Sequence, residues 1–172
     1  MTEQSESVRE KLVKAYDRMM EYLHEIMERG EGGAENLTQA LHEARDRVAD
    51  LDDVTREEAE KVADYLKRDL RQAGSYMDQS GHDMADWLHM DVELIEWSLI
   101  DLFMQAADNT KLQLLLLEEN AKHVDEYRSG EITGPGVLVC DNCGEELHFN
   151  KSGHIPPCPK CQASRFTRKH SK

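Results

Sequence analysis

The chain has 172 residues, a net charge of −14 and only 6% aromatic residues. This length fits one or two domains, and 39% apolar residues leave enough for a modest core, which argues against a disordered chain. Residues 134–172 carry six basic and three acidic residues, so residues 1–133 hold a net charge of −17. Such an acidic body repels phosphates and anionic membranes, which leaves only the C-terminal segment for a nucleic-acid contact.

Neither a secretory signal nor a membrane span is expected. The first twelve residues contain no apolar segment of the kind that a signal peptide needs, and the longest aliphatic run, Leu114–Leu117, is too short for a span. All four cysteines lie within 22 residues in two Cys-x-x-Cys pairs, a pattern typical of a metal site in a reducing compartment. We therefore predict a cytoplasmic protein without a membrane partner.

Apolar residues at steps of three and four predict two helices in the first 51 residues. The first runs from Ser5 to about Arg29, where Gly30, Gly32 and Gly33 end it, since glycine is common just past a helix. The second is spaced almost as a heptad seam over about two heptads, which favours a coiled coil. Its apolar residues are Leu37, Leu41, Ala44, Val48 and Leu51.

A third helix is predicted to begin after Thr55. Thr55 and Glu58 form a capping box, in which the hydroxyl and the carboxylate each accept a backbone N–H at the helix start. The connection from the second helix is short, so the two should be antiparallel neighbours. The apolar stripe of the third helix comprises Ala59, Val62, Leu66, Leu70, Ala73 and Met77.

Two further helical segments are predicted at residues 83–107 and 112–127. Apolar side chains such as Trp87 and Trp97 occur on several faces, which indicates burial from more than one side. We expect packing against the first three helices or a dimer seam. The segment Ser129–Gly136 is interpreted as a linker or as the entry to the next unit.

The four cysteines at positions 140, 143, 158 and 161 predict one structural metal site. Cys140 and Cys143 form the first pair, and Cys158 and Cys161 follow after fourteen residues. Zinc in structural sites takes four ligands in a tetrahedron, commonly all thiolates, and a filled shell leaves no position for a catalytic water. We predict one Zn²⁺ ion, with iron as the remaining alternative.

The residues around the cysteines predict a small β-type zinc ribbon over residues 134–172. Residues 137–139 and 147–149 have strand character, residues 150–153 have turn chemistry, and Phe166 is expected to pack over the metal site. His148 and His154 lie between the pairs, and we expect surface groups there. A unit of this size rarely folds on its core alone, so the ribbon should unfold without metal.

Basic residues of the ribbon are candidates for contact with nucleic acid or a partner. They are Lys151, Arg165, Arg168 and Lys169. A solvated basic tail is the plainer interpretation of the last three.

Two other patterns suggest more specific functions, a di-iron site and an RNA polymerase contact, but a plainer interpretation is favoured for each. Glu21-x-x-His24 and Asp86-x-x-His89 have the spacing of di-iron bundle ligands, but ordinary surface pairs are common in a chain with 35 acidic residues. Asp50–Asp53 lies at the turn of the helical hairpin, where capping and solvation explain it. In layout it is similar to the acidic tip of bacterial regulators that insert a coiled coil into RNA polymerase.

Several motifs together resemble the YbeL-like family of bacterial zinc-ribbon-containing proteins. They are Thr55-Arg-Glu-Glu58, Tyr65-Leu-Lys-Arg-Asp-Leu70, Gly130-Glu-Ile-Thr-Gly134, Leu138-Val-Cys-Asp-Asn-Cys-Gly144 and Ile155-Pro-Pro-Cys-Pro-Lys-Cys161 with Phe166. The resemblance extends from the first helix to the tail. It implies a cytoplasmic bacterial protein with helices before a zinc-binding domain, and it implies no activity.

The sequence therefore predicts a mainly α protein. An acidic, antiparallel and partly coiled-coil helical region at residues 1–133 precedes a four-cysteine zinc ribbon at residues 134–172. No nucleophile–base pair, phosphate loop or open metal site is found in the sequence, so we expect a non-catalytic protein-binding adaptor or regulator with an unidentified protein partner. The helices could form a homo-oligomer. The alternative is a transcription-associated or nucleic-acid-binding regulator that uses the ribbon.

Overall fold

The computed structural model describes residues 2–29, 37–51, 53–80 and 126–169. They form three helices, which are α1 (Thr2–Glu28), α2 (Leu37–Leu51) and α3 (Arg56–Ser80), followed by six short strands. The helices predicted within 83–125 lie outside the described residues. Tyr127, the last residue of the predicted 112–127 helix, belongs to a strand instead.

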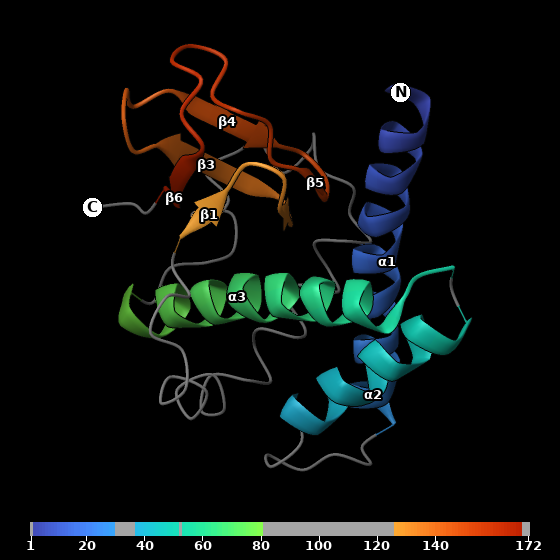
Figure 1. Cartoon of the computed structure of the whole chain (residues 1–172). Coiled ribbons are helices and arrows are strands. Elements are labelled where there is room, and N and C mark those ends of the chain that lie inside the picture. The colour runs from blue at the N-terminus through green and yellow to red at the C-terminus, as the bar shows by residue number, and fades with distance from the viewer. Residues whose placement is uncertain (1, 30–36, 52, 81–125, 170–172) are drawn as a thin grey trace.

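The three described helices lie where their apolar spacing predicted them, although α1 begins at Thr2 and not at Ser5. α2 and α3 run in opposite directions, as expected for a short connection, and α1 crosses α3 (Figure 1). The capping box is confirmed, because the Thr55 N–H donates to Glu58 Oε2 at 2.8 Å and the Glu58 N–H donates to Thr55 Oγ1 at 3.2 Å. No helix within the described residues is long and apolar enough to cross a bilayer.

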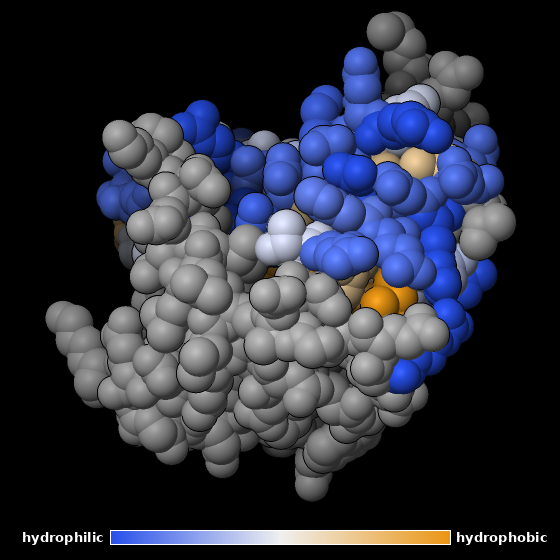
Figure 2. Space-filling model, turned by 90° about the horizontal axis from the view of Figure 1, so that it is seen from below, coloured by the Kyte–Doolittle hydropathy of each residue, from blue (hydrophilic) through white to orange (hydrophobic). Residues whose placement is uncertain are grey.

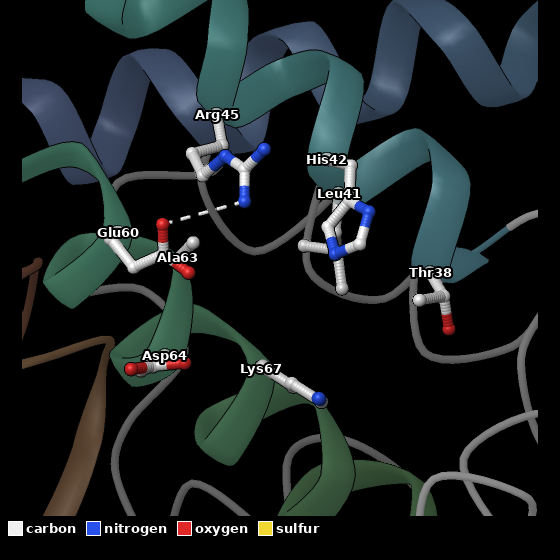
Figure 3. A pocket seen from close by; sticks show the side chains of 8 residues that line it. All are labelled: Thr38, Leu41, His42, Arg45, Glu60, Ala63, Asp64 and Lys67. Atoms are coloured by element: carbon white, nitrogen blue, oxygen red, sulfur yellow. Dashed lines mark hydrogen bonds and ion pairs between the residues drawn. The ribbon is translucent and has the colours of Figure 1, made fainter. Parts of the chain in front are cut away.

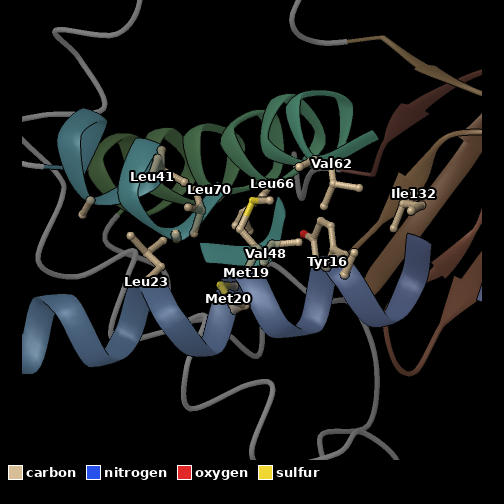
Figure 4. Close-up of a cluster of buried hydrophobic side chains, with 14 of the residues drawn as sticks. Tyr16, Met19, Met20, Leu23, Leu41, Val48, Val62, Leu66, Leu70 and Ile132 are labelled. Carbon is tan, nitrogen blue, oxygen red and sulfur yellow. The ribbon is translucent and has the colours of Figure 1, made fainter. Parts of the chain in front are cut away.

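The predicted apolar stripes of the three helices face one another in a single core. Tyr16, Met19 and Leu23 of α1 pack with Leu41 of α2 and Leu66 of α3 (Figure 4). All five are at most 4% exposed. Burial of each such side chain stabilises the fold by about 1.5–3 kcal/mol, so this cluster holds the helical layer together.

The strands form two antiparallel sheets after the helices. The larger has the order β1-β6-β3-β4, and the smaller pairs β2 with β5. The strands are β1 (Tyr127–Arg128), β2 (Ile132–Thr133), β3 (Gly136–Cys140), β4 (Glu146–Phe149), β5 (Gly153–His154) and β6 (Arg165–Arg168). The predicted hairpin is β3 and β4, in which Leu138 pairs with Leu147.

The sheets lie over α3 and beside α1 (Figure 1). β1 and β2 precede residue 134, the predicted start of the ribbon, yet each pairs with a strand that follows it. The segment Ser129–Gly136 is thus part of the ribbon and not a linker. Residues 132–138 are all buried.

The predicted fold class is confirmed in part. Helices come first and a small β-type unit follows, but the strands and loops of residues 126–169 make the described chain a helix-plus-sheet protein and not a mainly α one. The structure does not show a coiled coil among α1, α2 and α3.

Candidate metal centre

Two tight turns with the same hydrogen bonds position the four cysteines. The Gly144 N–H donates to the Cys140 carbonyl, and the Gln162 N–H donates to the Cys158 carbonyl, both at 2.9 Å. Gly144 (φ 73°) and Gln162 (φ 61°) both have left-handed backbones, which glycine adopts readily and other residues rarely. Each turn reverses the chain, so its two sulfur atoms face the same point.

The four sulfur atoms have the spacing of a tetrahedral metal site. All lie within 4.8 Å of one another. Cys140 Sγ is 3.6 Å from Cys161 Sγ, and Cys143 Sγ is 3.6 Å from Cys158 Sγ. Tetrahedral Zn–S bonds of about 2.3 Å require sulfur atoms about 3.8 Å apart, so the residues fit a zinc ion. Within the described residues, no other group of three or more His, Cys, Asp or Glu side chains converges in this way.

The site lies against a small core. Cys140 and Cys158 are buried, whereas Cys143 and Cys161 are half-buried. Phe166 is fully buried in the same cluster, which confirms the prediction that it packs over the site. The remaining members are Tyr127, Leu138 and Ile155, with Leu147, Phe149 and Ala163 at the edge.

The thiols differ in acidity. The Asn142 side chain and the Ala163 N–H lower the pKa of Cys161 to about 6. The Glu145 N–H lowers the pKa of Cys143, but burial and the three other cysteine sulfurs outweigh it and raise that pKa to about 12. Closely spaced thiols therefore do not all ionise by themselves. A divalent cation stabilises four thiolates together, and its binding releases their protons.

A comparison with protein families agrees with this geometry. Residues 24–170 match the family described as a zinc-ribbon containing domain. The chain belongs to this family. The YbeL-like resemblance of the sequence is confirmed, and the convergence of the four cysteines is consistent with the metal site of a zinc ribbon.

Relatives of this zinc-ribbon protein extend over nearly its whole length. The uncharacterized protein YbeL of Escherichia coli K12 is 28% identical over 157 residues, which cover 89% of this chain and 97% of YbeL. The YbeL proteins of E. coli O6:H1 and O157:H7 give the same values. No solved structure matches. The relatives are themselves uncharacterized, so they support the architecture of the zinc-ribbon protein and not an activity.

Three of the four predicted contact residues lie at the surface of the ribbon. Lys151 and Arg165 are exposed, and neither forms an ion pair within the described residues. Lys169 is half-buried, and its Nζ lies 2.6 Å from Glu146 Oε1. Lys160 pairs with Glu145 at 3.6 Å. The positive charge predicted for this surface is therefore partly neutralised by neighbouring carboxylates.

The prediction that Arg168 contacts nucleic acid or a partner is wrong, because its side chain is buried. It is 1% exposed. Its guanidinium donates to Thr133 Oγ1 at 2.8 Å, to the Pro135 carbonyl at 2.9 Å and to Tyr127 Oη at 3.2 Å. A Cβ at Gly136 would collide with this guanidinium, so the chain needs glycine there.

The acceptor at the centre of this buried network is Asp69 of α3, which is 0% exposed. Its carboxylate accepts hydrogen bonds from Gly134 N at 2.7 Å and from Tyr16 Oη and Tyr127 Oη at 2.8 Å. Arg68 Nε and Arg168 Nη2 each lie 3.4 Å from it. We call Asp69, Tyr16, Arg68, Tyr127 and Arg168 the Asp69 cluster.

Arg68 joins the same cluster to the loop between β1 and β2. Its guanidinium lies 3.8 Å from the centroid of the Tyr127 ring and donates to the Ile132 carbonyl at 2.9 Å. It also pairs with Glu131. Two arginines thus face two carboxylates at the junction of helix and sheet, which satisfies the condition under which buried charges are tolerated.

Burial and charge fix the protonation states of Tyr16, Tyr127 and Arg168. Burial raises the pKa of Tyr16, and the Asp69 carboxylate raises it further. Burial also raises the pKa of Tyr127, although the two arginines oppose this. For Arg168, burial lowers the guanidinium pKa, but Tyr127 and Asp69 raise it more. The tyrosines therefore stay neutral donors and the arginine stays charged at ordinary pH.

Sequence reasoning missed the role of Asp69, although a signal was present. Asp69 stands between Leu66 and Ala73 at steps of three and four, on the apolar stripe of α3. A charged residue on such a stripe indicates a buried partner elsewhere in the fold. The partner itself was not predictable, because Arg168 lies 99 residues away and was assigned to the surface.

Neither histidine of the ribbon belongs to the sulfur cluster. His148 is exposed and lies 3.5 Å from Glu146, as expected for a surface group. His154 is half-buried, and both its ring nitrogens are buried, beside the backbone of Gly130 and Glu131. The surface prediction is therefore wrong for His154. On α1, Glu21 pairs with Arg18 at the surface, as the plainer interpretation of Glu21-x-x-His24 predicted.

Proposed function

We propose that this protein is a non-catalytic adaptor or regulator that binds another protein through its ribbon. One structural Zn²⁺ ion, held by Cys140, Cys143, Cys158 and Cys161, would fix the ribbon surface. The observation that carries the proposal is the closed set of four converging sulfur atoms. Four thiolates leave a zinc ion no open position for water or substrate, so its chemistry is to hold the fold.

Two hollows on the described helices are unlike small-molecule sites, which supports a non-catalytic role. One groove between α2 and α3 is lined by Leu41, His42, Arg45, Glu60 and other side chains (Figure 3) and has a volume of about 50 Å³. Ligand sites usually measure about 300–1,000 Å³ and are mostly apolar. The Arg45–Glu60 ion pair, at 3.5 Å, further occupies this groove.

A second hollow, of about 300 Å³, lies between α1 and the start of α3. Charged groups dominate its lining, which includes Glu10, Lys11, Lys14 and Asp53. Lys11 already pairs with Glu58 at 3.2 Å. The hollow lacks the apolar walls that bury a small ligand.

The exposed residues of the ribbon support the proposed adaptor role. Exposed residues of the two cysteine turns include Asp141, Asn142, Pro157, Pro159 and Lys160. A metal and two prolines restrict their backbone, so a partner would lose little conformational entropy on binding them. The described residues on the face shown in Figure 2 are mainly hydrophilic.

Capture from a nuclease-treated bacterial lysate tests the adaptor role. The full chain, the Cys140→Ser/Cys158→Ser variant and an α2 surface variant, Glu43→Ala/Asp46→Ala, serve as baits. We expect a stoichiometric protein to be captured by the full chain and by the α2 variant but not by the cysteine variant. The same binding should be seen with purified components. Recovery of the bait alone contradicts the adaptor role. A truncation at residue 133 is unsuitable, because it removes the partners of β1 and β2.

The alternative function is a transcription-associated or nucleic-acid-binding regulator. It is favoured by one observation, the two exposed cations Lys151 and Arg165, which have no ion pair within the described residues. If both contact phosphates, the slope of log affinity against log salt changes by about 0.9 for each residue converted to Glu. Glu57→Gln on α3 is the control. Binding that is insensitive to salt and to both substitutions contradicts this alternative.

We further propose cytoplasmic residence and self-association through the helices. Four unpaired thiols, none in a disulfide, suit a reducing compartment. The apolar stripes of α1, α2 and α3 are already buried in their own core, so within the described residues the support for self-association is one large apolar side chain, Val8 of α1, which is 46% exposed. Sedimentation equilibrium of the full chain tests self-association, and a monomer at all concentrations contradicts it.

A further inference from the structure

We propose that metal binding by the ribbon controls which surface the helical region presents. The Asp69 cluster would transmit the state of the metal site to α1 and α3. The inference goes beyond the adaptor role and does not depend on it.

The first step links a cysteine ligand to Arg168 through one strand pairing. In the register of β3 and β6, Cys140 lies opposite Phe166, and Leu138 lies opposite Arg168. Phe166 also pairs with Tyr127 of β1. Loss of the metal releases the turn that begins at Cys140, and the same ladder holds both Arg168 and Tyr127 in place.

The second step concerns how Asp69 is satisfied. Of the five donors described above, three come from the ribbon, namely Tyr127, Gly134 and Arg168. The helices supply Tyr16 and Arg68. When the ribbon unfolds, a fully buried carboxylate loses most of these donors and must regain them from water.

The third step is an apolar contact between the ribbon and the helices. Ile132 of β2 belongs to the helical core and lies beside Tyr16 and Val62 (Figure 4). Removal of the ribbon therefore exposes an apolar patch next to a carboxylate, on the side of α1 and α3 that the sheets now cover. The metal-bound form presents the ribbon surface, and the metal-free form presents this helical surface.

α2 is expected to remain protected in both forms. It packs on α1 and α3 through Leu41, Ala44 and Val48, and none of the five donors to Asp69 described above belongs to it. The change is thus a local opening of one face and not a loss of the helical layer.

Hydrogen exchange of the full chain, followed by mass spectrometry with and without a zinc chelator, tests the proposal. On chelation, we expect amides at residues 12–20 and 62–73 to exchange roughly tenfold faster or more, while α2 amides change less than about twofold. Unchanged exchange in α3 while the ribbon loses protection overturns the proposal. Equal loss of protection in all three helices also overturns it, since the chain is then one cooperative unit.

Arg168→Gln isolates the transmitting side chain, and Arg165→Gln on the same strand is its matched control. We expect zinc-loaded Arg168→Gln to retain metal but show the fast α3 exchange of the chelated protein, and Arg165→Gln to match the wild type. Wild-type protection in Arg168→Gln overturns the role of the guanidinium. If Arg168→Gln does not retain metal, Thr133→Val, which removes one acceptor of Arg168, replaces it under the same criteria.

Discussion

The helical region and the ribbon are held together by different physical means. α1, α2 and α3 bury a continuous apolar cluster that includes Met19, Leu23, Leu66 and Leu70. The ribbon buries a far smaller cluster, in which Cys140 and Cys158 are themselves members. A core of that size cannot hold a fold without further support, so a metal held by the four cysteines would supply in the ribbon what apolar burial supplies in the helices.

The junction between the two regions is held by buried charged and polar side chains. Asp69 and Arg168 are both fully buried there, with Tyr16, Tyr127 and Thr133 as neutral partners. Buried charges stabilise little compared with apolar groups of the same shape, but they are costly when one partner is lost. Apolar burial thus stabilises the helices and metal binding would stabilise the ribbon, while the docking of the two regions depends on a specific match of charges.

The largest effect is expected from removal of a metal ligand. Cys140→Ser should abolish stable metal binding and the order of residues 137–168, because metal binding contributes about 10–16 kcal/mol in comparable small zinc domains. Metal content and the amide NMR spectrum measure both. His148→Ala is the control, since His148 is exposed and outside the sulfur cluster. Full metal retention in Cys140→Ser would contradict the assignment.

Loss of the central carboxylate should separate the two regions. Asp69→Asn leaves Arg68 and Arg168 facing each other with one fewer counter-charge, and the free energy of unfolding should fall by about 3–5 kcal/mol. Urea denaturation measures it. Asp64→Asn, an exposed position on the same helix, should change stability by less than about 0.5 kcal/mol. Equal effects at the two positions would show that the junction is not charge-dependent.

A cavity in the helical core should weaken the helices and spare the metal site. Leu66 is 0% exposed, so Leu66→Ala should cost about 2–5 kcal/mol of unfolding free energy. Metal content below the transition should match the wild type. Lys61→Ala, at an exposed position of α3, is the control. Metal loss in Leu66→Ala at low temperature would mean that the ribbon needs the helical core in order to fold.

The capping box of α3 should have a smaller effect. Thr55→Ala removes the oxygen that accepts the Glu58 N–H and should cost about 1 kcal/mol. Arg56→Ala is the control, because its contact with Asp50 is a surface ion pair at 3.7 Å. Thermal unfolding compares the two. A larger loss in Arg56→Ala than in Thr55→Ala would contradict the capping assignment.

The smallest effect is expected on the pH dependence. Burial lowers the pKa of His154 below its ordinary value of 6.5, and Arg9 lowers it further, although the backbone of Gly130 and Glu131 opposes this. A depressed histidine pKa means that the unfolded chain binds the proton first. Stability is then full above pH about 6.5 and falls as the pH drops toward the folded-state pKa.

His154→Gln should flatten this dependence between pH 7 and 5, and His148→Gln should not. Urea unfolding at several pH values measures the slopes. The same slope for wild type and His154→Gln would show that another group titrates in this range.

Much of the fold was predictable from local patterns. The apolar steps predicted α1, α2 and α3, Thr55 and Glu58 predicted the start of α3, and two Cys-x-x-Cys pairs predicted the metal site. These signals are readable because each is set by residues a few positions apart: a helix face repeats every three or four residues, and a cysteine turn closes within five.

The sequence by itself therefore determined α1, α2 and α3, the cysteine turns and the family of the protein. Only the tertiary structure decided where the ribbon begins, that Ser129–Gly136 is part of it, and that Arg168 is an interior residue while Arg165 is a surface one. Both arginines lie on one strand of a basic tail, and composition cannot distinguish them. What distinguishes them is a carboxylate 99 positions earlier in the chain, which becomes a neighbour only when the sheet docks on α3.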